Sequence, residues 1–124
     1  MQDLGERTFQ FALGVVRLVA GLPSNKVTRV ICPQLLRSGT SVGANWEEAT
    51  GASSQADFVY RVEICERESR ESNYWLRLLE ASGFARGPEV VALKEESKQL
   101  VAIFTSIGRK GKRKGEKGKA DGGT

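Results

Sequence analysis

The residues of this chain whose types could support chemistry are mainly glutamates, because the sequence contains no histidine. A carboxylate di-iron site in a helical bundle needs inward-facing glutamates and a Glu-x-x-His motif on two helices. The histidines of that motif are missing, so we expect no metal. Glu63 and Glu66 each precede an arginine by four residues (Arg67 and Arg70), which is typical of a solvated helix face with mixed charges. The glutamates weighed for a metal site are Glu47, Glu48, Glu63, Glu66, Glu68 and Glu71.

The missing histidine also argues against catalysis. It removes the usual general base, the Ser-His and Cys-His nucleophile pairs and the commonest transition-metal ligand. The two cysteines, Cys32 and Cys65, are too few for a disulfide framework, and we expect small buried side chains in a reducing compartment. We therefore expect a protein that is not an enzyme, with no catalytic residue and no cofactor.

Gly39 and Gly43 lie within residues 37–45, a segment rich in small residues. The segment lacks the GxxxxGK[ST] spacing and the lysine that a phosphate-binding loop requires, so we expect no nucleotide site. Two glycines inside a helix cost about 1 kcal/mol each relative to alanine. We expect the close approach of another helix or subunit to offset this cost.

Basic residues are concentrated at the C-terminal end of the chain. The formal charge is +4, but residues 108–124 hold seven basic residues against Glu116 and Asp121, so the remaining body carries −1. Flexible basic residues displace counterions from a polyphosphate without needing a defined geometry. We predict that they contact phosphates of a nucleic acid, RNA above all, although a solubilising or tethering role stays open. These residues are Arg109, Lys110, Lys112, Arg113, Lys114, Lys117 and Lys119.

The apolar pattern predicts four helices that must position these residues. The first begins at Leu4 and ends near Pro23. The second follows a cap at Ser24 or Asn25. It either kinks at Pro33, or a separate turn over residues 27–32 precedes a helix with Pro33 in its first turn.

The third and fourth helices have clearer boundaries. Ser54 followed by Asp57 resembles a capping box, and Gly83 supplies a left-handed stop. Pro88 then occupies a first-turn position, and the fourth helix is expected to stop at Gly108.

Polar residues fall on the apolar seams of the second and third helices, where they cost stability unless they are hydrogen-bonded. We predict a buried network that fixes register or oligomeric state. Trp46, Tyr74 and Trp75 could stack nucleobases, but large aromatic residues in bundles are more often core or subunit contacts. The predicted seam residues are Asn45, Glu48, Ser69, Glu71 and Ser72.

Four amphipathic helices with short connections and no strand signal predict an all-α, antiparallel, up-down-up-down four-helix bundle over residues 1–107. Residues 108–124 lack large apolar side chains and are predicted to be a disordered Gly/Lys-rich tail. No segment approaches the roughly 20 apolar residues of a membrane span, and the N-terminus does not resemble a secretory signal. We expect a cytoplasmic protein that does not contact membranes.

Several motifs occur together and in order: Gln34-Leu-Leu-Arg-Ser-Gly-Thr-Ser-Val-Gly-Ala-Asn45, Glu48-Ala49, Ser54-x-Ala-Asp-Phe58, Glu68-Ser-x-Glu-Ser72 and Tyr74-Trp-Leu-Arg-Leu-Leu79. Over about residues 6–107 the chain thereby resembles the bacterial four helix bundle proteins, also called 23S rRNA intervening-sequence proteins. The resemblance implies an antiparallel bundle that assembles as a ring-like homo-oligomer, typically a pentamer, and it implies no catalytic motif.

The same resemblance suggests partners. Some members are encoded within intervening sequences of large-subunit ribosomal RNA genes, and related accessory proteins of diversity-generating retroelements bind RNA and a reverse transcriptase. We expect a homo-oligomer that binds RNA or a ribonucleoprotein. The alternative is a protein-interaction scaffold or accessory subunit that does not itself bind nucleic acid.

Overall fold

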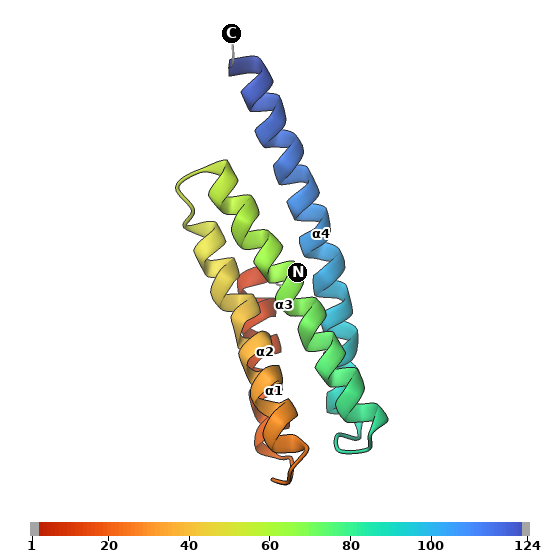
Figure 1. The fold of residues 1–124 in the computed structure, drawn as a ribbon. Helices are drawn as coiled ribbons and strands as arrows, with labels where there is room; N and C mark the ends of the chain where they lie inside the picture. The colour runs from red at the N-terminus through yellow and green to blue at the C-terminus, as the bar shows by residue number, and fades with distance from the viewer. Residues whose placement is uncertain (1–2, 123–124) are drawn as a thin grey trace.

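The computed structural model describes the backbone of residues 3–122 and the side chains of residues 3–118. Successive helices run antiparallel, and the described residues contain no strand (Figure 1). The predicted all-α four-helix bundle is thus confirmed. Its helices are α1 (Leu4–Ala20), α2 (Thr28–Thr50), α3 (Gln55–Ala81) and α4 (Pro88–Gly122).

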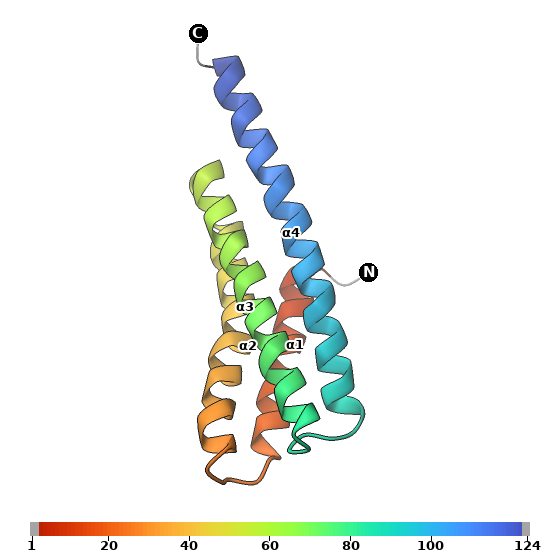
Figure 2. The ribbon, with the colours of Figure 1, turned by 45° about the vertical axis from the view of Figure 1, so that its right-hand side comes forward.

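The third helix is the centre of the packing. It lies along both α2 and α4, whereas α1 packs mainly on α2 and touches α4 over a shorter stretch (Figure 2). The apolar stripes predicted for the helices meet in one core, in which Leu35, Leu76 and Leu100 are fully buried and Phe104 is 1% exposed. Burial of this apolar surface is the main favourable contribution to folding.

The helix starts follow the local sequence. The Ser54 hydroxyl accepts a hydrogen bond from the Asp57 N–H at 3.0 Å, as the capping pattern predicted. Before α2, the Asn25 carboxamide oxygen accepts from the N–H groups of Val27 and Thr28 and so satisfies two donors at the start of the helix, whereas the N-cap residue itself, Val27, makes no side-chain cap. The helix α2 begins at Thr28 and continues through Pro33, which rules out a separate turn before the proline.

The connection from α3 to α4 also matches its prediction. Gly83 has φ +83° and Gly87 has φ +102°, values that only glycine adopts readily. Pro88 is the first residue of α4, where its missing N–H costs nothing.

The glycines of α2 allow α1 to approach closely. A Cβ atom on Gly39 would lie 2.9 Å from Val15 Cγ2, and one on Gly43 would lie 3.1 Å from Thr8 Oγ1. This confirms that the two glycines serve helix packing.

Both cysteines are free and buried, as predicted for small core residues. Burial raises the pKa of the Cys65 thiol to about 12, and the thiol donates to the Val42 carbonyl at 3.4 Å. Burial raises the pKa of Cys32 as well. Neither thiol is therefore primed for nucleophilic chemistry.

The structure corrects the expected end of the fourth helix. The helix α4 does not stop at Gly108 but continues to Gly122 and projects past the loop between α2 and α3 (Figures 1 and 2). We refer to residues 108–122 as the α4 extension.

The start of the α4 extension is held against α3. Gly108 and Gly111 are buried, and the Gln55 carboxamide donates to the Gly111 carbonyl at 3.1 Å. A Cβ on Gly111 would lie only 2.8 Å from Val59 Cγ2. The missing side chains let α4 lie against α3, and this packing offsets the low helix propensity of glycine that underlay the disorder prediction.

A pair of alanine substitutions tests this packing. Gly115→Ala should stabilise the extension by about 0.5–1 kcal/mol, because its Cβ would meet only Gln55 Cγ at an ordinary 3.7 Å. Gly111→Ala should loosen the extension, because Val59 is β-branched and cannot move aside easily. Circular dichroism and amide hydrogen exchange of the extension measure both effects. Equal gains in protection for the two variants would contradict the packing on Val59.

Candidate nucleic-acid interface

The glycines and the basic residues of the α4 extension lie on different faces of the helix. Gly108, Gly111 and Gly115 are spaced by three or four residues and lie against α3, and Gly118 follows on the same side but has no neighbour within 4 Å of a Cβ placed there. Five exposed basic residues lie on the other faces of the helix, away from this line of glycines. We call them the outward cations: Arg109, Lys110, Arg113, Lys114 and Lys117.

Helical geometry orders the outward cations. Residues four apart lie about 6 Å apart along a helix axis, so Arg109, Arg113 and Lys117 form one row and Lys110 and Lys114 a second. None of the five forms an ion pair within the described part of the chain. Their charge is available to an anionic partner.

Two of the seven predicted phosphate contacts differ from the rest. The Lys112 ammonium lies 3.2 Å from a Glu63 carboxylate oxygen of α3, so it helps to hold the extension against the bundle. The side chain of Lys119 lies outside the described residues.

A second basic surface lies on the bundle itself. An open groove beside α2 and α3 is lined by four arginines, two glutamates and two aromatic side chains. We call it the arginine–aromatic groove: Arg37, Arg67, Glu68, Arg70, Glu71, Tyr74, Trp75 and Arg77.

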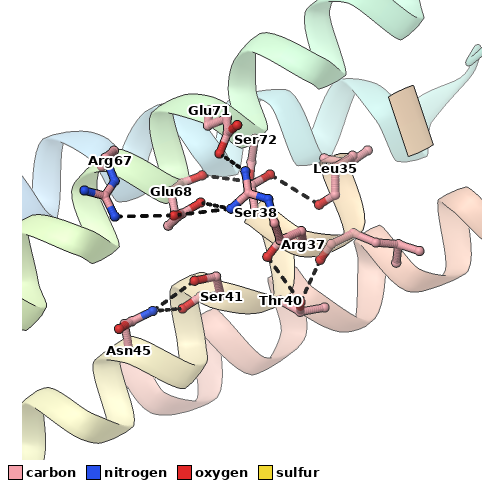
Figure 3. Close-up of polar contacts among 11 residues, drawn as sticks. Leu35, Arg37, Ser38, Thr40, Ser41, Asn45, Arg67, Glu68, Glu71 and Ser72 are labelled. Carbon is pink, nitrogen blue, oxygen red and sulfur yellow. Dashed lines mark hydrogen bonds and ion pairs between the residues drawn. The ribbon is translucent and has the colours of Figure 1, made fainter. Parts of the chain in front are cut away.

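Arg37 of α2 bridges both groove carboxylates of α3 (Figure 3). Its guanidinium lies 3.2 Å from Glu68 Oε2 and donates to Glu71 through the other nitrogen. The Glu68 side chain is only 8% exposed. Burial raises the pKa of Glu68, and the neighbouring Glu71 raises it further. Burial is the largest influence on Glu71 and opposes its ionisation, but the hydrogen bonds and the charge of its neighbours, Arg37 first among them, together outweigh burial, so the pKa of Glu71 is lowered.

The other groove arginines are more loosely engaged. Arg67 is 70% exposed and lies 3.7 Å from Glu68, and Arg70 is 61% exposed and lies 3.8 Å from Glu66. Arg77 donates through Nε to the neutral Asn73 carboxamide at 2.9 Å. Because Arg37 already neutralises much of the carboxylate charge, these three arginines present net positive charge to solvent.

The predicted polar seam is only partly assembled. The hydroxyls of Ser38 and Ser72 lie 2.9 Å apart in the core between α2 and α3, and Ser72 also donates to the Glu68 carbonyl. Ser72 and Glu71 thus belong to one cluster with Arg37 and Glu68.

The other predicted seam residues stand apart from this cluster. Asn45 is half-buried, donates to Ser41 and accepts from Arg61. Glu48 is exposed, and Ser69 Oγ is buried with no hydrogen-bond partner in the described residues. The bridge from Arg37 to Glu68 was missed, since sequence spacing alone does not show which residues of two helices face one another.

The aromatic residues divide between core and surface. Trp46 packs against Phe58 and Phe104, with ring centroids 6.2 and 5.8 Å apart, as expected of a core residue. Tyr74 is 50% exposed and meets partly buried Trp75 edge to face. Of Trp46, Tyr74 and Trp75, Tyr74 is therefore the one whose ring is open to a ligand, with Trp75 beside it.

Within residues 3–118, no three acidic or cysteine side chains converge in a way that would suit a metal ion. None of the described helices combines the length and apolar character that crossing a membrane requires.

Comparisons with known proteins agree with this architecture. A family model described as 23S rRNA-intervening sequence protein matches residues 2–106. The fold is similar to the solved structure of a protein of unknown function from the S23 ribosomal protein family of Bacteroides thetaiotaomicron VPI-5482. The TM-score is 0.78 and the identity 32%, over 86% of this chain and 98% of that chain. No curated protein matches. The whole α4 extension lies outside the family match.

The two groove carboxylates should affect stability with opposite pH dependence. Glu71 has a lowered pKa in the folded state, so its contribution is present above the ordinary glutamate pKa and is lost as pH falls through the folded value. Glu71→Gln should cost about 0.5–1 kcal/mol at neutral pH and nothing in acid.

Glu68→Gln is the matched variant. The raised pKa of Glu68 favours folding at low pH, and this contribution is lost as pH rises through the folded value, so the substitution should be best tolerated near neutrality. Urea unfolding at a series of pH values measures both profiles. If the free energy of unfolding changed with pH in the same way in both variants, Arg37 would not shift the pKa values of the two carboxylates differently.

Proposed function

Because this chain belongs to the 23S rRNA-intervening sequence protein family, we propose that it is a non-enzymatic RNA-binding protein whose α4 extension provides the main phosphate-binding surface. The observation that carries this proposal is the set of five outward cations on a helix that α3 holds in place. A polyanion is the partner that such a surface attracts most strongly.

Electrostatic screening explains why the local arrangement matters more than the body charge of −1. At physiological salt the Debye length is about 8 Å, so a phosphate near the extension interacts mainly with the nearest side chains. A binding role also accounts for the absence of histidine and for two buried, unreactive cysteines. Free cysteines are consistent with a reducing compartment, and we place the protein in the cytoplasm.

Charge neutralisation tests the proposal without removing the helix. Replacing all five outward cations with glutamine should abolish most RNA affinity, because glutamine keeps helix propensity but releases no counterions. Fluorescence anisotropy against salt concentration measures the change. Each neutralised phosphate contributes about −0.7 to the slope of log affinity on a single strand, so these residues can account for at most about −3.5.

Lys112→Gln is the control, because Lys112 is exposed like the outward cations but pairs with Glu63. This substitution should change the slope of log affinity against log salt by less than the replacement of any one outward cation with glutamine. Unchanged RNA affinity and slope in the fivefold variant would place the binding surface elsewhere.

A second candidate function, binding of protein, is favoured by exposed apolar side chains. On α1, Phe9 is 60% exposed and Val16 is 43% exposed, and their spacing of seven residues places them on one face. We propose that this face forms the homo-oligomer contact, as a pentamer if the resemblance holds. If the protein does not bind RNA, the alternative function is that of a scaffold or accessory subunit, for example of a reverse transcriptase.

The oligomer is tested by light scattering at micromolar concentration. The full chain should give a mass several times 13.5 kDa. The double variant Phe9→Ser, Val16→Ser should dissociate, because it removes apolar area from the proposed contact. Val91→Ser is the matched control, since Val91 is 55% exposed on α4. A wild-type mass near 13.5 kDa would refute the assembly.

A further inference from the structure

The arginine–aromatic groove has a feature that the α4 extension lacks, namely an exposed aromatic ring among cations. Tyr74 is half exposed at the surface of α3, and the Trp75 ring meets it at 5.1 Å and 75°. The Arg77 guanidinium lies 5.7 Å from the Tyr74 ring centroid. Tyr74 is thus supported by its neighbours while part of its surface stays open.

The groove also holds a buried polar atom without a partner. Trp75 Nε1 is buried and makes no hydrogen bond among the described residues. A buried donor of this kind is costly unless a ligand or water accepts from it.

We propose that the arginine–aromatic groove binds one unpaired nucleotide of the RNA, with the base stacked on Tyr74 and the adjoining phosphates held by Arg67, Arg70 and Arg77. The inference rests on the proposed function and adds the form of RNA that is recognised. A paired base hides its faces within the duplex, whereas an unpaired base can stack on an aromatic side chain.

One strand can reach both basic surfaces. Glu66 lies 3.8 Å from Arg70 of the groove and accepts a hydrogen bond from Thr105 of α4. Thr105 precedes Arg109, the first outward cation, by about one helical turn. Glu66, Arg70 and Tyr74 follow one another at four-residue spacing along α3, so a strand that leaves the extension at Arg109 and follows this line reaches Tyr74.

The chain contains a closely matched control for Tyr74. Tyr60 also lies on α3, is 59% exposed and has an arginine, Arg61, at 5.6 Å from its ring centroid. Its surroundings differ, because Tyr60 shares its pocket with Glu63 and Glu116 and with no arginine. A comparison of Tyr60 with Tyr74 thus keeps the exposure of the ring and its contact with one arginine similar, and changes whether the ring lies in the arginine–aromatic groove.

The experiment measures the anisotropy of two fluorescent probes with the full-length protein. One probe is an oligoadenylate RNA of about eight nucleotides, and the other is a strand of equal length whose bases are replaced by abasic spacers. Tyr74→Ala should weaken binding of the base-bearing strand about tenfold and leave the abasic strand unchanged. Tyr74→Phe should bind like the wild type, and Tyr60→Ala, which lies beside the α4 extension, should leave the ratio of the affinities for the two strands unchanged.

A second variant tests the phosphate contacts. Arg70→Gln should weaken both strands equally and reduce the salt slope, because a guanidinium that binds phosphate does not sense the base. Thermal unfolding followed by circular dichroism checks that each variant remains folded.

The outcomes separate this inference from the proposed function. If Tyr74→Ala and Tyr60→Ala have equal effects, or if Tyr74→Ala weakens the abasic strand as much as the base-bearing one, the groove is not a base site. The outward cations retain their role in that case, provided that their neutralisation still abolishes binding. If the wild-type chain binds neither strand at low salt, both proposals fail together.

Discussion

Small side chains at helix contacts are the constraint on which the rest of this structure depends. Gly39 brings α2 against Val15 of α1, and Gly111 brings α4 against Val59 of α3. Each glycine costs about 1 kcal/mol of helix propensity, which close packing of apolar groups must offset. The contacts therefore fix not only the distance between helices but also how far each helix can slide along its neighbour.

The register set in this way decides the electrostatics of the surface. The buried hydrogen bond between Ser38 and Ser72 is satisfied in only one alignment of α2 and α3, although its net contribution is about 1 kcal/mol. Arg37 is the residue before Ser38, and Glu68 and Glu71 lie within one turn of Ser72. The alignment that pairs the serines thus brings one guanidinium between two carboxylates. Arg37 offsets one of the two acidic charges, and the other groove arginines, Arg67, Arg70 and Arg77, lie exposed around the pair.

The sequence predicted the helices and the close helix approach at Gly39 and Gly43, and it missed the contacts for which spacing does not identify the facing residue of a second helix. Apolar spacing, the Ser54 cap and the stop at Gly83 predicted the helices correctly, because each signal acts over one turn or less. The extension was predicted as disordered, since its composition is poor in apolar residues and rich in glycine. The regular spacing of Gly108, Gly111 and the later glycines was the available signal. The glycine spacing indicates helix packing only if α3 presents Val59 and Gln55 to it. The sequence of the extension does not show that these residues of α3 face the glycines.

The same dependence on α3 changes how the basic residues can act. In a flexible tail each contact with a phosphate would have to repay an ordering cost of roughly 1–2 kcal/mol per residue. On a helix already held by Gln55 and by the pair of Lys112 with Glu63, most of that cost is met during folding. The cations then meet a strand as a pre-organised row, which favours affinity for a given charge. It follows that packing of the first two turns of α3 against the extension contributes to RNA affinity, although Gln55 and Val59 carry no charge of their own.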